Sequence, residues 1–144
     1  MDYPDLYGYR FEELKTGMAA TVSRTITETD LRNFSGVSGD TNPMHLNEEF
    51  AKQTPFGGCI VHGMLTASLI SAVIGTKLPG PGCIYMSQTL KFLAPVRVGD
   101  TVYAVCTIKE LTPAKQRVLL DTKCWVKGVV VIDGEALIKM PPRP

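Results

Sequence analysis

Alternating apolar and polar positions dominate the second half of the chain and predict β-strands there. In residues 101–108, for example, Val102, Ala104 and Cys106 share one face. We expect a turn at Lys127–Gly128 and a bulge at Gly134, since glycine in a strand often marks a bulge. The predicted strands are residues 83–93, 101–108, 117–127 and 129–139.

The first half mixes one strand with short helices. Residues 19–27 alternate and are rich in β-branched side chains, which predicts a strand. Thr27 followed by Asp30 has the spacing of a helix N-cap, and Leu31 and Phe34 continue a helical apolar pattern. Asn47 is a second candidate cap, for a short helix over residues 48–52.

The strongest helical signal covers residues 63–76, which contain no charged side chain. Such a helix would be ~20 Å long, too short for the ~30 Å core of a bilayer. A helix that is apolar all round belongs inside a protein. One long buried central helix followed by antiparallel strands predicts an α+β fold in which a curved sheet wraps around that helix.

Composition narrows the functional classes. The 144 residues suit one domain, and a net charge of +1 gives no electrostatic case for nucleic acid or an anionic membrane surface as partner. The four cysteines are widely spaced without a CxxC motif, so we expect reduced thiols, no metal site and no cofactor. The N-terminus lacks a signal-peptide pattern, and we expect a cytoplasmic protein.

The chemistry is concentrated in residues 39–45, Gly-Asp-Thr-Asn-Pro-Met-His. In a helix, Asp40 and His45 would point about 140° apart. Pro43 and Gly39 instead predict a bent, non-helical loop that aims the carboxylate and the imidazole at one point. Such a pair can hold and activate one water molecule by general acid–base catalysis. The simpler alternative is that Asp40 only forms a turn before Asn42–Pro43.

With these elements in place, the chain resembles the MaoC-like, (R)-specific enoyl-CoA hydratases of the hot-dog fold. The resemblance rests on residues 38–45, on Ile-Val-His-Gly-Met-Leu at 60–65 and on residues 85–100. It implies a single hot-dog domain over residues 19–144, preceded by an N-terminal extension, residues 1–18. It also implies a homodimer and a substrate, a trans-2-enoyl thioester of coenzyme A, hydrated reversibly to an (R)-3-hydroxyacyl-CoA.

Three groups are expected to carry this reaction. We interpret Asp40 as the principal base and His45 as the group that orients the water, although the sequence alone leaves these two roles interchangeable. The N–H of Gly63, at the start of the buried helix, would stabilise the thioester oxyanion. Gly63 has an alternative explanation as a steric requirement of helix packing.

Other residues are expected to support the site. Asn42 and Pro43 would hold the loop. His62, beside the helix start, is expected to bond locally to the backbone. By resemblance, Ser71 and Ile74 would line the acyl pocket, although core packing explains them equally well.

Several other functions fit the same fold. The nearest is a dehydratase of another acyl-CoA or acyl-carrier-protein thioester, because the chemistry is the same. A hot-dog acyl-CoA thioesterase and a non-catalytic acyl-binding subunit are further alternatives. The intact pair of Asp40 and His45 argues against both.

Overall fold

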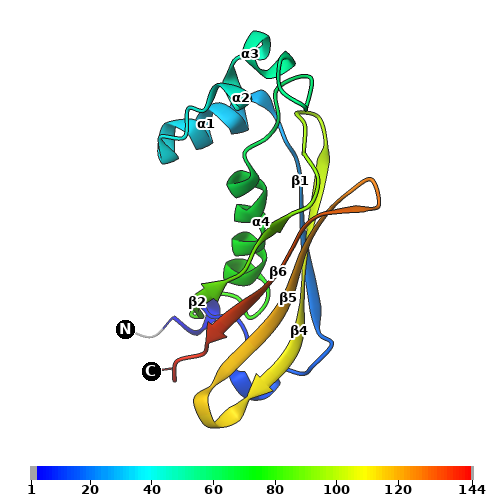
Figure 1. Cartoon of the computed structure of the whole chain (residues 1–144). Helices are drawn as coiled ribbons and strands as arrows, with labels where there is room; N and C mark the ends of the chain where they lie inside the picture. Colours follow the sequence, from blue (N-terminus) through cyan, green and yellow to red (C-terminus); the bar gives the residue numbers. More distant parts are fainter. Residues whose placement is uncertain (1–2, 144) are drawn as a thin grey trace.

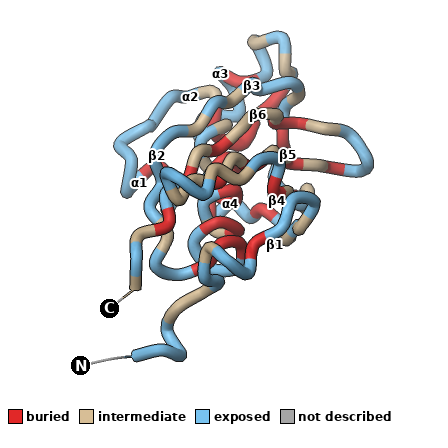
Figure 2. Tube along the Cα trace, turned by 90° about the horizontal axis from the view of Figure 1, so that it is seen from below, coloured by how far each residue is buried: buried red, intermediate tan, exposed pale blue. Residues whose placement is uncertain are grey.

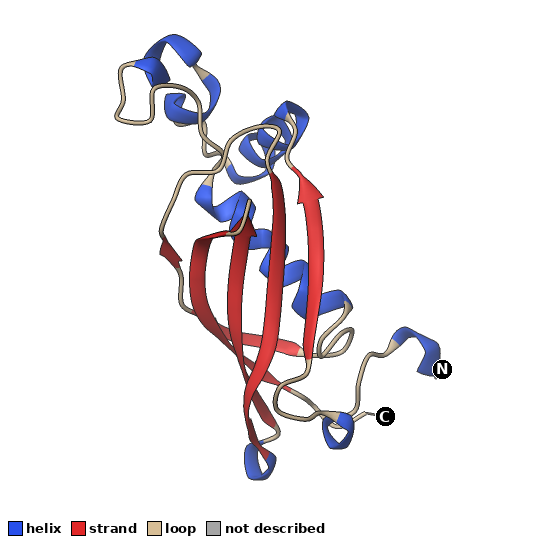
Figure 3. Cartoon of the chain, turned by 90° about the vertical axis from the view of Figure 1, so that its right-hand side faces the viewer, coloured by secondary structure: helices blue, strands red, loops and turns tan. Residues whose placement is uncertain are grey.

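A six-stranded antiparallel sheet curves around one helix in the computed structural model, which describes residues 3–143 (Figures 1 and 3). The strand order is β1-β4-β5-β6-β2, with the short β3 also paired to β6. The predicted α+β hot-dog architecture is confirmed. The strands are β1 Ala19–Thr25, β2 Ile84–Gln88, β3 Lys91–Phe92, β4 Thr101–Thr112, β5 Arg117–Val126 and β6 Val129–Lys139.

The predicted strand over residues 83–93 is divided into β2 and β3, and Gly134 explains why. A Cβ at Gly134 would lie 1.8 Å from the carbonyl oxygen of Thr89, so the chain between β2 and β3 crosses directly over this glycine. The predicted bulge at Gly134 is wrong, because Gly134 pairs regularly with Thr122. The β5–β6 register shifts instead at Val131, which is the extra residue. Close backbone approach, rather than a bulge, accounts for the glycine.

The turn between β5 and β6 is where the sequence predicts it. Lys127 and Gly128 have φ values of 50° and 77°. Two consecutive residues with positive φ are typical of the tight turns that match the twist of a hairpin.

Three helices lie together beyond one end of the sheet: α1 Glu28–Ser38, α2 Pro43–Leu46 and α3 Glu48–Lys52 (Figure 1). The predicted capping box is present, since the Thr27 hydroxyl accepts from the Asp30 N–H and the Asp30 carboxylate accepts from the Thr27 N–H. Asn47 likewise caps α3 through the Phe50 N–H. Three short 3-10 turns complete the chain, η1 Pro4–Leu6, η2 Phe11–Glu13 and η3 Pro113–Lys115.

The core lies between α4 Gly63–Thr76 and the inner face of β4 and β5 (Figure 2). Ile70, Val73 and Ile74 on α4 are 0% exposed. Burial alternates along β5, as expected for a strand with one face on a core. In the described part of the chain, no helix is long and apolar enough to cross a membrane.

One face of α4 is open, which corrects the expectation of a helix buried all round. Met64, Ser68 and Ser71 are exposed and follow one another at helical spacing. The uncharged sequence predicted the position of this helix correctly but could not show that small polar side chains leave one of its stripes uncovered.

Candidate active site

Asp40 owes its position to the end of α1. Gly39 takes the left-handed conformation, with φ 76°, and its N–H closes the helix on the carbonyl of Ser35 at 2.9 Å. The chain therefore leaves the helix axis one residue before Asp40. The Asp40 side chain is exposed, and its Oδ1 accepts from the N–H of Asn42 at 3.3 Å.

Pro43 starts a helical turn, which corrects the expectation that residues 39–45 form a wholly non-helical loop. Proline is favoured at the first position of a helix, because its φ is already helical and it lacks only an N–H that would have no partner there. Asn42 is non-helical, with φ −49° and ψ 124°, and its side-chain oxygen accepts from the Met44 N–H at 3.0 Å. The bend is therefore a capped helix start, and it carries His45 in the first turn of α2.

His45 is held by a backbone carbonyl. Its Nδ1 lies 2.7 Å from the carbonyl oxygen of Ile60, and the residue is 9% exposed. A carbonyl oxygen only accepts hydrogen bonds, so Nδ1 carries the proton. In the neutral ring, Nε2 is then the atom with a free lone pair, able to accept a proton from water.

His62 joins the two predicted catalytic residues. It is 1% exposed, and its ring stacks on that of His45, with centroids 3.9 Å apart and an interplanar angle of 30°. Its Nε2 lies 3.1 Å from the carbonyl oxygen of Asp40 and 3.0 Å from the hydroxyl of Ser35. Burial lowers the pKa of the His62 imidazole, which favours the neutral ring.

Asp40, His45 and His62 each contribute one polar atom to a cluster whose members lie within 4.8 Å of one another. A water molecule makes hydrogen bonds of about 2.8 Å, so a single water can contact two atoms that lie 4.8 Å apart.

The residue types of this cluster, one carboxylate and two imidazoles, could also ligate a metal ion. Ring-nitrogen lone pairs lie in the ring planes, however, so two stacked rings present them side by side instead of directing them to one ion.

Gly63 follows His62 directly and begins α4, where backbone N–H groups have no partner within the helix. A Cβ at this position would lie 2.6 Å from Cε1 of Phe92. The packing reason for glycine is therefore visible in the structure. The role of its N–H as oxyanion donor stays a prediction.

A cavity of about 470 Å³ borders the site. His45 lines it, together with residues of α1, α3 and the loops around Cys59 and Arg97. Of the other predicted residues, Ser71 lies on the open stripe of α4 and Ile74 is fully buried in the core. Neither lines a described cavity, so their acyl-pocket role stays a prediction.

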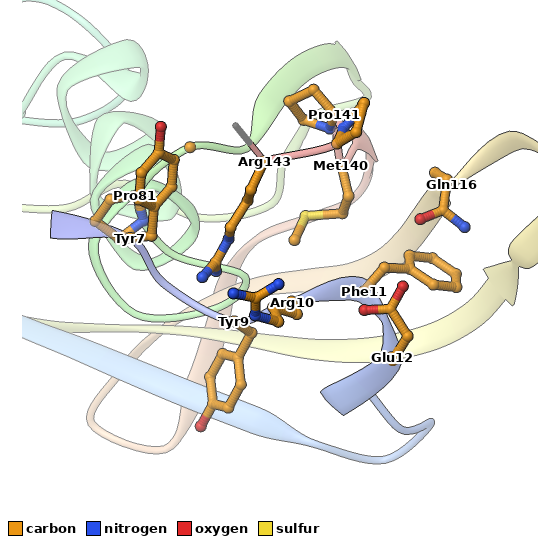
Figure 4. A pocket seen from close by; sticks show the side chains of 12 residues that line it. Tyr7, Tyr9, Arg10, Phe11, Glu12, Pro81, Gln116, Met140, Pro141 and Arg143 are labelled. Atoms are coloured by element: carbon orange, nitrogen blue, oxygen red, sulfur yellow. The ribbon is translucent and has the colours of Figure 1, made fainter. Parts of the chain in front are cut away.

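A second cavity, of about 380 Å³, lies among the N-terminal segment, the segment around Pro81 and the C-terminal tail (Figure 4). Arg143 lies over the ring of Tyr7 there, 4.9 Å from its centroid. None of the predicted catalytic residues lines this cavity. We therefore do not assign the reaction to it.

Sequence reasoning missed two partners of the site. Ile60 acts through its carbonyl group, which leaves no side-chain signal. Ser35 lies on α1 four residues before Gly39 and is 5% exposed, and its place one helical turn after the apolar Leu31 was the sequence signal that it faces inward.

Comparison with known proteins identifies the family. The profile described as MaoC like domain matches residues 10–133. The chain belongs to the MaoC-like domain family. A MaoC-like relative from Rhodospirillum rubrum, named (R)-specific enoyl-CoA hydratase, is 52% identical over 99% of both chains. Another from Methylorubrum extorquens, named 3-hydroxybutyryl-CoA dehydratase, is 49% identical over 97% of this chain and 89% of its own.

Solved structures agree with the family assignment. The (R)-hydratase from A. caviae involved in PHA biosynthesis has a TM-score of 0.87 and 40% identity, covering 90% of this MaoC-like chain and 99% of its own. An R-hydratase from Pseudomonas aeruginosa has a TM-score of 0.86 and 45% identity, covering 92% and 86%.

Proposed function

We propose that this MaoC-like chain is an (R)-specific enoyl-CoA hydratase, which adds water reversibly to a trans-2-enoyl-CoA to give an (R)-3-hydroxyacyl-CoA. The observation that carries the proposal is the cluster of Asp40 and His45, whose polar atoms lie within 4.8 Å of each other and of His62 at the start of α4. The relatives named as hydratase or 3-hydroxybutyryl-CoA dehydratase support it, since these names describe one reaction in its two directions.

The proposed chemistry begins with one water held between Asp40 and His45. The water oxygen bonds to the β-carbon of the enoyl group as one of its protons passes to the base, and the double-bond electrons move onto the thioester oxygen. The proton then passes to the α-carbon, which completes the addition. We keep Asp40 as principal base and proton carrier, with His45 polarising the water, a contribution of roughly 10²–10⁴-fold.

The oxyanion needs a donor close to the helix start. We propose the N–H of Gly63, because an unpaired amide and the positive end of the α4 dipole coincide there. A donor of this kind is worth a few kcal/mol of barrier. Asn42 and Pro43 support the pair by capping and starting α2.

We further propose that two copies form a homodimer through the β2 side of the sheet. β2 is an edge strand, and Ile84, Tyr85 and Met86 on it are 49%, 38% and 43% exposed. Exposed apolar side chains on an unpaired edge favour pairing with another strand. A second copy would also cover the open stripe of α4 at Ser71, where an acyl chain is otherwise unprotected from water.

The direct test uses purified protein and crotonyl-CoA. We expect loss of the conjugated enoyl absorbance without release of free thiol, and an (R) product when the reaction is coupled to an enantiomer-specific dehydrogenase. Thiol release would establish a thioesterase instead. An (S) product would contradict the proposed stereochemistry, and a strong preference for acyl-carrier-protein thioesters would move the assignment to the alternative dehydratase.

A further inference from the structure

His62 contacts both residues proposed to hold the water, through the backbone carbonyl of Asp40 and the ring of His45, yet the reaction gives it no chemical step. It is also almost completely buried, at 1% exposed, which keeps it from meeting substrate directly. The chain has two histidines, and both of them lie in this one cluster.

The contacts of His62 define its protonation. The Asp40 carbonyl at 3.1 Å only accepts, so Nε2 carries the proton and donates there, sharing it with the Ser35 hydroxyl at 3.0 Å. Nδ1 is buried without a hydrogen-bond partner among the described residues. An N–H at that buried position would be unsatisfied, so the neutral Nε2–H tautomer fits the site best.

The ring of His62 restrains His45. The Ile60 carbonyl holds one edge of the His45 ring, and that hydrogen bond alone leaves the ring free to tilt about it. Stacking on His62 at 3.9 Å removes this freedom. The ring of Phe34 packs against His62 in turn, with centroids 4.9 Å apart.

We infer that His62 is a positioning residue, whose N–H fixes the backbone of Asp40 while its ring fixes the imidazole of His45. One buried side chain thereby sets the spacing between the two groups that hold the water. This inference rests on the proposed hydratase function. A misplacement of about 1 Å between reacting groups can lower turnover by about 10²-fold.

Two variants separate the two contacts. His62→Gln offers an N–H to Asp40 without a ring, and His62→Phe offers a ring without an N–H. We expect each to lower kcat on crotonyl-CoA by about 10²-fold, with KM within about threefold because His62 does not touch the substrate. Thr66→Val is the matched control, since Thr66 is also 1% exposed and its hydroxyl has no described partner, and its kcat should be unchanged.

A double-mutant cycle distinguishes positioning from general destabilisation. If His62 acts through Asp40, His62→Phe should cause little further loss of kcat in an Asp40→Asn background. A purely structural role would instead multiply the two losses. Multiplied losses, or a kcat within about twofold of wild type in His62→Phe, would overturn the inference.

A measurement independent of turnover completes the test. Heteronuclear NMR of the two imidazoles should show His62 as the neutral Nε2–H tautomer at neutral pH, and should show the His45 ring signals shifting in His62→Gln as the stacked ring is lost. An Nδ1–H tautomer for His62, or unshifted His45 signals, would sink the positioning role. Wild-type protein that is inert toward crotonyl-CoA but has the expected spectrum would overturn the proposed reaction instead.

Discussion

The Nδ1 of His45 lies 2.7 Å from the carbonyl oxygen of Ile60. This contact leaves Nε2 of the neutral ring as a proton acceptor on the side of the ring away from the carbonyl. His45 is therefore equipped to polarise a water molecule, and we propose the exposed carboxylate of Asp40 as the second contact of that water.

Asp40→Asn should lower kcat by roughly 10²–10⁴-fold without altering stability. Asparagine keeps the side-chain oxygen that accepts from Asn42 N–H, so the turn survives whereas the base is lost. Steady-state kinetics with crotonyl-CoA and a thermal melt measure the two effects. Glu49→Gln, another exposed acid outside the cluster, is the control. A near-normal rate for Asp40→Asn would remove Asp40 from the mechanism.

His45→Gln should reduce both turnover and stability. Turnover falls by a similar factor, because the flexible amide cannot orient and polarise the water as the imidazole Nε2 is proposed to do. The free energy of unfolding should drop by ~1–3 kcal/mol, since the stacked ring is removed and a flexible amide replaces the ring N–H at the buried Ile60 carbonyl. Denaturant titration followed by kinetics on the folded fraction separates the two losses. Full activity of the folded fraction would count against a role for His45.

Gly63→Ala distinguishes packing from chemistry at the start of α4. The added methyl would meet the ring of Phe92 at 2.6 Å, so we expect a lower melting temperature. Adding Phe92→Ala should relieve that clash and restore stability while turnover stays low, because the methyl still hinders approach of the thioester to the Gly63 N–H. Recovery of turnover along with stability would favour the purely steric explanation.

Met86→Lys should convert the proposed homodimer to single chains, as measured by light scattering coupled to size exclusion. A charge on the β2 edge opposes strand pairing with a second copy. Val129→Lys is the matched control, since Val129 is 55% exposed but lies at the start of β6, beside the turn from β5. Dissociation in both variants, or in neither, would contradict an interface through β2.

Asp30→Asn should destabilise the fold at neutral pH but not in strong acid. The hydrogen bond from Arg24 lowers the pKa of Asp30 to about 2 from its ordinary 3.8. The pair therefore stabilises the fold above about pH 4, and this contribution is lost as the pH falls toward 2. Because Arg24 is 54% exposed, we expect a difference of only about 1–2 kcal/mol at pH 7.

The control for this prediction is Glu28→Gln, which breaks the exposed Glu28–Arg32 pair on the same helix. Its effect should be close to zero at either pH, because the side chains are 72% and 70% exposed. Urea titrations at pH 7 and pH 2 make the comparison. An Asp30→Asn effect that does not diminish in acid would contradict the ion-pair explanation.

Local sequence patterns predicted most of the fold. The caps at Thr27 and Asn47, the helix starting at Gly63 and the turn at Lys127–Gly128 depend on short-range chemistry that the sequence displays directly. The division of β2 from β3 could not be read in this way, because it depends on the Thr89 carbonyl lying over Gly134, forty-five positions further along. The open stripe of α4 was missed for a similar reason, since uncharged serines give no sign of exposure.

The site was predicted in part. Asp40 and His45 stand out because proline and glycine flank them, and their polar atoms do lie together. The link through His62 was not visible, because it needs the end of α1, the start of α2 and the start of α4 to meet in space. Pro43 predicts a bend from the sequence, whereas in the structure it begins α2. Proline favours both turns and the first position of a helix, so the residue alone does not distinguish the two.

The cluster formed by Asp40, His45 and His62 and its partners comes from one short stretch of chain, from Ser35 to Gly63. The strands that follow α4 carry most of the sheet, the proposed dimer edge of β2, and Phe92, which lies against Gly63. The groups proposed to carry the reaction thus precede most of the sheet in the sequence. A chimera that exchanges residues after α4 with those of a relative should therefore keep the type of reaction while its dimer contact changes.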